Sequence, residues 1–212
     1  AATAIIISPW TLAVLFFSGM SALAFLTTGA TQSSRLDRPT FLDLVLASVS
    51  IAAGIYFAVN ASDIELRIVL LDVLTGWEIF FASIVFALTL EITRRTTGLG
   101  LTTLVLCFVV YNLFGHHLSG VLQHGLITYE HFIEITVFTT DGIFGLPVRV
   151  AATYAFLFVM FGTLLQACKG GDFFFDFAAS ISGRQAGGPA KVAVISSGMY
   201  GMVSGSPTSD VV

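Results

Sequence analysis

The sequence predicts an all-α polytopic membrane protein. Hydrophobic residues make up 56% of the 212 residues and charged residues only 10%, whereas roughly a quarter of the residues in a soluble domain are charged. The mean hydropathy is +0.92. Apolar segments close to the roughly 20 residues that cross a bilayer recur along the chain, separated by short polar stretches. Together these observations argue against a water-soluble globule and predict about five transmembrane helices.

The first three predicted spans lie in the N-terminal half. Ile5–Thr28 contains Pro9-Trp10, an aromatic entry typical of a membrane interface. The second span is Phe41–Val59, and an acidic connection, Asn60–Asp72, follows it. The third span is Val73–Thr93. We expect a fourth to start after Gly98-Leu99-Gly100 and to end near Gly115, and a fifth over Pro147–Ala167.

Two further segments mix acidic and apolar side chains and are predicted to be interfacial amphipathic helices. Tyr129–Asp141 is expected on the outer surface, where Glu130 and Glu134 would face a soluble partner. Asp172–Ile181 is expected along the cytoplasmic face, with its phenylalanines as a membrane anchor.

The distribution of Lys and Arg predicts the orientation, because cytoplasmic loops are enriched in these residues. If the spans alternate, only Arg67 and Arg149 of the nine basic residues lie outside. The loop Thr31–Thr40 and the segment Ser182–Gly188 are therefore predicted to be cytoplasmic.

The stretch Gly187–Val212 is the most informative for function. It begins as an apolar helix with Lys191 as its only basic residue, gathers Gly and Ser, and meets Pro207. A broken helix at membrane depth is tolerated only where it is buried in protein or lines a wet cavity. We predict the first arm of a re-entrant helical hairpin, whose tip binds substrate or ion through these residues: Ser204, Gly205, Ser206, Pro207, Thr208, Ser209 and Asp210.

Oxygen ligands suit a hard cation. We expect Na⁺ at the tip, near Ser204, Ser206, Thr208 and Asp210, and no other cofactor or catalytic residue. The alternative is a helix-packing surface, because small residues let membrane helices approach closely. A carboxylate beside a broken helix favours the site, because it is costly without a role.

Other polar residues have plainer interpretations. His116, His117, His124 and His131 lack the fixed spacing of a zinc site, and solvated loop residues are the favoured reading. Glu78 is expected at the interface, with pairing inside the bundle as the alternative. Glu91, Arg94 and Arg95 are expected to form a surface pair at a helix end. Cys107 and Cys168 suggest neither a disulfide nor a metal.

Several motifs occur in an order that is similar to one transporter family. GIFGLP (Gly142–Pro147) precedes ATYAFLFVMFG (Ala152–Gly162), and GDFFFDFA (Gly171–Ala178) follows. The segment Gly183–Val192 and the SGS…D of Ser204–Asp210 complete the set. The chain resembles permeases of tripartite ATP-independent periplasmic (TRAP) transporters, especially the type with fused small and large subunits and a TAXI-type binding protein.

The resemblance implies a bacterial or archaeal inner-membrane permease that imports organic acids with sodium. Residues 1–125 would be scaffold helices like those of the small subunit, and residues 126–212 would begin the large-subunit transport domain. Its implied partners are a periplasmic solute-binding protein, the organic acid, membrane lipids and the remainder of the large-subunit domain; no nucleic acid is expected. Pro207 and Ser209 depart from the Ser and Ala that are commoner in the family.

Two rival functions are a non-transporting scaffold that anchors partner proteins and an intramembrane enzyme. The sequence holds no HExxH or GxSxG motif, so an enzyme is not expected. The sequence lacks an initiating Met and stops within the candidate tip, so we expect it to be part of a longer chain. The substrate is not predictable from half a site.

Overall fold

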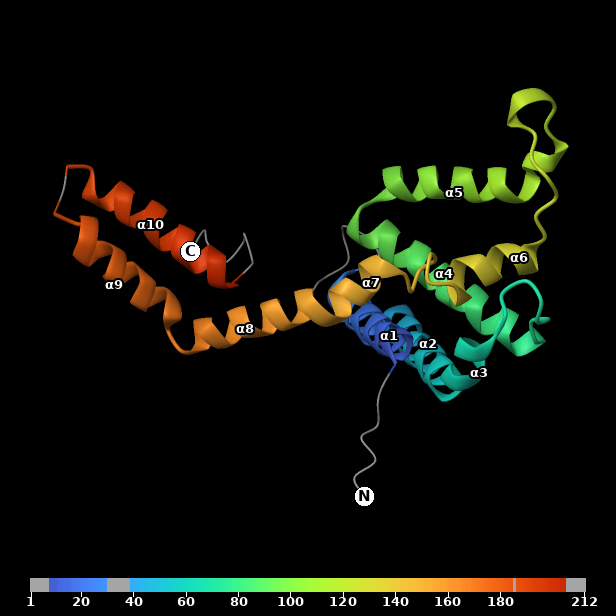
Figure 1. The fold of residues 1–212 in the computed structure, drawn as a ribbon, viewed down its shortest axis with the longest axis horizontal. Helices are drawn as coiled ribbons and strands as arrows, with labels where there is room; N and C mark the ends of the chain where they lie inside the picture. The colour runs from blue at the N-terminus through green and yellow to red at the C-terminus, as the bar shows by residue number, and fades with distance from the viewer. Residues whose placement is uncertain (1–7, 30–38, 185, 205–212) are drawn as a thin grey trace, which may run out of the picture. The chain divides into compact units, whose positions relative to one another are not determined.

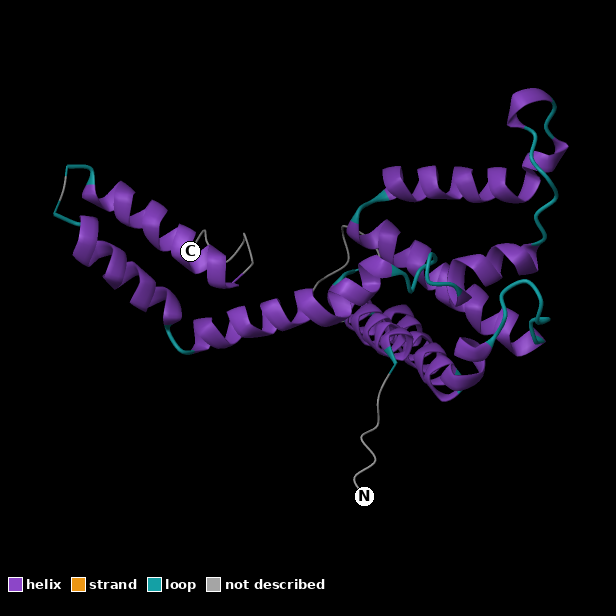
Figure 2. Ribbon diagram, in the orientation of Figure 1, coloured by secondary structure: helices purple, strands orange, loops and turns teal. Residues whose placement is uncertain are grey.

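The structure is a computed structural model that describes residues 8–29, 39–184 and 186–204. Within these ranges the regular elements are helical (Figures 1 and 2). The longer helices are α1 (Pro9–Thr27), α2 (Phe41–Val59), α4 (Gly76–Thr96), α5 (Leu99–Phe114), α8 (Phe156–Ala167), α9 (Gly170–Ser182) and α10 (Gly188–Ser204). The short ones are α3 (Ala61–Leu66), η1 (Gly115–His117), η2 (Gly120–Leu122), α6 (Tyr129–Ile133), α7 (Leu146–Val150) and two π-helical turns, η3 (Glu134–Phe138) and η4 (Ala151–Ala155).

Among the described residues, five helices are long and apolar enough to cross a membrane, which confirms the predicted number. They are α1, α2, α4, Leu99–His117 and Leu146–Ala167. The third span starts three residues later than predicted, at Gly76. A capping box explains this start, because the Thr75 N–H donates to Glu78 Oε2 at 2.6 Å.

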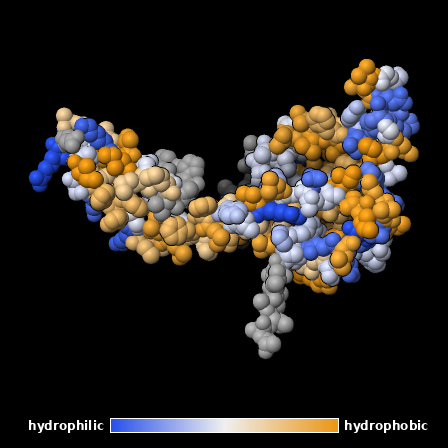
Figure 3. Space-filling view, in the orientation of Figure 1, coloured by the Kyte–Doolittle hydropathy of each residue, from blue (hydrophilic) through white to orange (hydrophobic). Residues whose placement is uncertain are grey.

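The outer surfaces of these helices match a lipid environment. Figure 3 shows apolar side chains over the visible faces of α5 and α8. Leu104 and Phe108 of α5 are exposed, as are Phe156 and Phe158 of α8. In water this exposure would be a liability, whereas in a bilayer it is the expected contact with lipid.

The chain divides into two compact units, Ala1–Arg149 and Val150–Val212, and each is described by itself. In the first unit α1 and α2 pack closely. A Cβ added at Gly54 would lie 2.2 Å from Ser18 Oγ, so the two backbones approach because Gly54 has no side chain. The buried hydroxyls of Ser21 and Ser50 hydrogen-bond between the same helices. This contact fixes the register of the pair.

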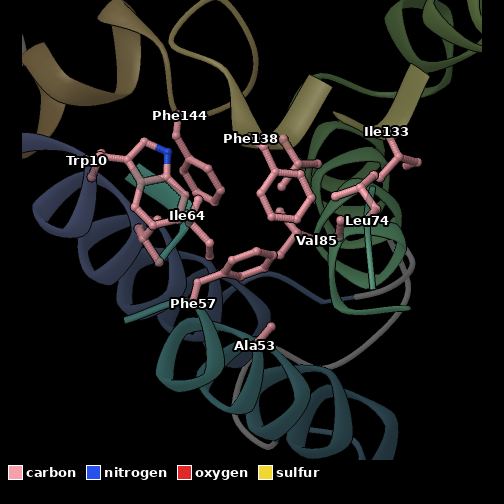
Figure 4. Close-up of a cluster of buried hydrophobic side chains, with 13 residues drawn as sticks. Trp10, Ala53, Phe57, Ile64, Leu74, Val85, Ile133, Phe138 and Phe144 are labelled. Carbon is pink, nitrogen blue, oxygen red and sulfur yellow. The ribbon is translucent and has the colours of Figure 1, made fainter. Parts of the chain in front are cut away.

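An aromatic cluster fills the centre of the first unit (Figure 4). The rings of Trp10 and Phe144 lie 5.7 Å apart, and those of Phe57 and Phe138 lie 5.6 Å apart, both edge-to-face. Phe138 closes the π-helical turn η3, and Phe144 follows in the GIFGLP motif. The segment after α6 therefore supplies core residues for α1 and α2.

The segment Tyr129–Asp141, predicted as an interfacial helix, forms the short helices α6 and η3. It is buried in the first unit more than an interfacial helix would be. Ile133 and Val137 are fully buried. Glu134 is only 5% exposed, and its Oε1 accepts a hydrogen bond from the Leu70 N–H at 3.1 Å. The expectation that Glu134 faces a partner is wrong, because the π-helical turn directs it toward the loop before α4. Glu130 is exposed, as predicted.

In the second unit the predicted amphipathic segment forms α9, which packs beside α10 (Figure 1). Lys169 adopts a left-handed conformation with φ 57° at the turn between α8 and α9. The rings of Phe174 and Tyr200 meet edge-to-face, 6.2 Å apart. A Cβ at Gly188 would lie 2.3 Å from the Gly183 carbonyl oxygen. Glycine at that position therefore permits the tight turn from α9 into α10.

Candidate functional site

Helix α10 is the predicted first arm of the hairpin. It begins at Gly188, with Pro189 in its first turn, where a missing N–H costs nothing. Its 17 residues correspond to about 26 Å, short of the roughly 30 Å hydrocarbon core. This length fits a re-entrant arm better than a full span.

The predicted tip lies almost entirely outside the described residues. Ser204 is the last residue of α10. The other six candidate residues, Gly205, Ser206, Pro207, Thr208, Ser209 and Asp210, fall beyond the part that the structure describes. The helix break at Pro207 and the sodium ligands therefore stay predictions, while the arm that leads to them is helical as expected.

Tyr200 is a polar residue on this arm that the sequence reasoning missed. It is 6% exposed, and its hydroxyl has no hydrogen-bond partner among the residues that the structure describes. Its ring packs on Phe174 of α9. The available signal was a lone tyrosine within a run of Gly, Ser and small apolar residues.

A charged network joins the ends of α1, α2 and α4. The Arg95 Nη1 donates to Asp43 Oδ1 at 2.7 Å and to the Thr28 carbonyl oxygen at 2.9 Å. Its Nε donates to Glu91 Oε1 at 2.8 Å. The Arg95 side chain is 2% exposed and that of Asp43 is 4% exposed. The surface pair predicted at this end is therefore correct for Arg94 but incomplete for Arg95, which is buried across three helices.

This network also bears on topology. The C-terminal ends of α1 and α4 meet the N-terminal end of α2, as alternating spans require. At the opposite ends, the Ser8 hydroxyl donates to Glu65. Arg67 Nη2 reaches both carboxylate oxygens of Glu78 at 2.8 Å. Glu78 thus has the ion-pair partner that the alternative required, but the pair lies at the start of α4, where an interfacial residue was expected.

A small cavity lies between α1, α2 and α4 beside Ser18, Ser50 and Gly54. The Ser18 hydroxyl already donates to the Leu15 carbonyl oxygen and the Ser50 hydroxyl to the Ser18 carbonyl oxygen. The cavity lining holds no charged residue. Its hydroxyls are engaged in helix packing.

Across the described ranges, no three His, Cys, Asp or Glu side chains gather as a metal-ligand set. The rings of His116 and His117 contact each other in a tilted arrangement, with centroids 3.9 Å apart. His124 instead contacts the end of α5, hydrogen-bonding to the Tyr111 carbonyl oxygen.

The comparison with protein families decides the identity. The model of the family "Tripartite ATP-independent periplasmic transporter, DctM component" matches residues 84–212. The chain belongs to the DctM family. It is a permease component of a TRAP transporter and a multi-pass membrane protein, as the resemblance implied. The match runs from within α4 through α10 and includes all seven candidate tip residues. No curated protein and no solved structure matched the chain.

Proposed function

We propose that this DctM chain is part of a sodium-coupled, binding-protein-dependent secondary transporter that imports organic acids. One observation carries the proposal. The family match extends to the end of α10 and over the oxygen-rich stretch Ser204–Asp210. An arm too short to span, followed by hydroxyls, a proline and a carboxylate, has the composition of a broken-helix ion site.

The chemistry of the tip follows from its residues. Pro207 has no N–H, so a carbonyl one turn earlier lacks its usual helical partner and can face a cation. Asp210 would supply negative charge, directly or by orienting the loop. The hydroxyls of Ser204, Ser206 and Thr208 would complete an oxygen ligand set. Transport, and not catalysis, is the proposed activity.

We assign the scaffold role to residues 1–125 and the start of the transport domain to residues 126–212. Phe138 and Phe144 belong to residues 126–212, but their rings pack against Phe57 of α2 and Trp10 of α1. This packing supports a stable contact between the proposed scaffold and the start of the transport domain. The location proposed is a bacterial or archaeal cytoplasmic membrane, with a periplasmic binding protein outside.

A non-transporting scaffold is the second candidate, and the interlocked ends of α1, α2 and α4 favour it for the first half of the chain. A transporter moves substrate across the membrane, whereas a scaffold does not, so an uptake assay distinguishes the two functions. The full-length permease and its binding protein would be reconstituted in proteoliposomes and offered radiolabelled mono- and dicarboxylates. We expect uptake that needs both an inward sodium gradient and the binding protein. Equal uptake with a potassium gradient would refute sodium coupling, and no uptake of any tested acid would favour the scaffold.

A further inference from the structure

His124 is placed where only its doubly protonated ring satisfies both of its contacts. Its Nε2 lies 3.0 Å from the Tyr111 carbonyl oxygen, and its Nδ1 lies 2.7 Å from the Gly125 carbonyl oxygen. A carbonyl oxygen only accepts hydrogen bonds, so each ring nitrogen must donate. Neutral imidazole carries one N–H, whereas imidazolium carries two.

The His124 imidazole packs against the C-terminal end of α5. A Cβ at Gly115 would lie 2.2 Å from His124 Nε2, so the ring occupies the space that any side chain at Gly115 would fill. The Tyr111 and His124 rings meet edge-to-face, 5.2 Å apart. The Tyr111 hydroxyl donates to the Leu122 carbonyl oxygen at 2.9 Å. Two side chains thus fasten the loop 118–125 to the last turn of α5.

The charges nearby also favour a cation at this place. Tyr111 belongs to the last turn of α5, where the helix dipole attracts positive charge, and its carbonyl oxygen also accepts the Gly115 N–H. From Thr96 to Tyr129 the sequence contains no Asp, Glu, Lys or Arg. The titratable groups on α5 and η1, the elements packed against the ring, are Cys107 and Tyr111 from α5 and His116 and His117 from η1.

We propose that His124 is a proton-operated latch that fastens the loop 118–125 to the end of α5 and weakens when the ring loses a proton, because the neutral ring can donate to only one of its two carbonyl partners. The loop follows the fourth span, on the side that the basic residues predict to be outside. Its shape would then follow the external pH. The latch is a property of this loop and does not depend on sodium coupling.

The sign of the pH effect follows from the contacts. The hydrogen bond to the Tyr111 carbonyl, and then the one to the Gly125 carbonyl, raise the pKa of His124 above its ordinary value. A group whose pKa is raised in the fastened state stabilises that state at low pH. The stabilisation is lost as the pH rises through the raised pKa.

The test is a distance measurement on the full-length permease in nanodiscs. Spin labels would be placed at Leu104→Cys and Val121→Cys, both exposed, with the native cysteines changed to serine. We expect a narrow distance distribution at acidic pH that broadens at alkaline pH. The His124→Gln variant should give a broad distance distribution that does not depend on pH. Its side-chain amide has a single NH2 group with which to donate, and it does not titrate in this range.

Two further variants test whether the pH response comes from the His124 contacts and not from pH acting elsewhere on the protein. Gly115→Ala retains the histidine but should displace its ring. The distance distribution should then be broad at acidic pH, and the pKa of His124 should fall in an imidazole NMR titration. His131→Gln, outside the loop, should behave as the parent protein does. A pH-independent distribution in the parent protein, or a pH response that survives in His124→Gln, would overturn the proposal.

Discussion

The buried pair of Asp43 and Arg95 should be a principal source of stability in the first unit. We consider Asp43→Asn, which removes the charge while the amide oxygen can still accept the Thr40 N–H that Asp43 Oδ2 now accepts at 2.9 Å. Arg95 would keep Glu91 and the Thr28 carbonyl oxygen, but Glu91 is shared with Arg94. Two arginines would then share one carboxylate, and the Arg95 side chain is 2% exposed.

The magnitude follows from that burial. Removing one partner of a buried ion pair costs about 3–5 kcal/mol, mostly because the other charge stays buried. We take the lower end, about 3 kcal/mol, since Glu91 still binds Arg95. For a unit of about 150 residues, such as the first unit, each kcal/mol lowers Tm by roughly 2–4 °C, so a loss of roughly 6–12 °C is expected for its transition.

The assay is intrinsic tryptophan fluorescence during thermal unfolding of the full-length permease in detergent, since Trp10 is buried in the core of this unit. Arg94→Gln is the matched control: it removes a pair to the same Glu91, but its side chain is 35% exposed. Such an exposed pair contributes about 0–1 kcal/mol. If Asp43→Asn lowered Tm no more than Arg94→Gln does, the network would not be the stabilising element argued above.

Three further predictions concern topology, helix packing and partner binding. An impermeant thiol reagent added outside should label a cysteine at Ser62 and not one at Ser33; the reverse would overturn the orientation. Gly54→Ala should cost about 1–3 kcal/mol by forcing α1 from α2, whereas Gly19→Ala, with no atom within 4 Å, should not destabilise; equal melting temperatures would count against close packing. Glu130→Lys should weaken binding-protein-driven uptake at low ionic strength, and unchanged uptake there would exclude this surface.

The spans were predictable because apolar length alone determines them. The bounds of α2 coincide with the predicted Phe41–Val59, since Thr40 and Asn60 flank a mainly apolar segment. The start of α4 was less predictable, because the capping box at Thr75 and Glu78 competes with apolar residues that precede it. Local sequence therefore places membrane helices to within a few residues.

Contacts between distant residues were not predictable in the same way. Nothing near Arg95 in the sequence indicates that Asp43 and the Thr28 carbonyl lie beside it. Glu134 was expected at the surface because carboxylates usually are solvated, but the π-helical turn and the Leu70 N–H allow its burial. For the candidate site, the sequence predicted the helical arm α10. The assignment of the tip as an ion site depends only on the residue types of Ser204–Asp210.

The sodium dependence of transport tests the central claim most directly. Uptake by the full-length permease with its binding protein would be measured against sodium concentration for Asp210→Asn. The control is Asp176→Asn, an exposed carboxylate on α9. We predict that Asp210→Asn raises the sodium concentration for half-maximal uptake at near-normal expression, that the control does not, and that Gly205→Val abolishes uptake. If Asp210→Asn and Gly205→Val both kept the parent sodium dependence, Ser204–Asp210 would be a packing surface and not an ion site.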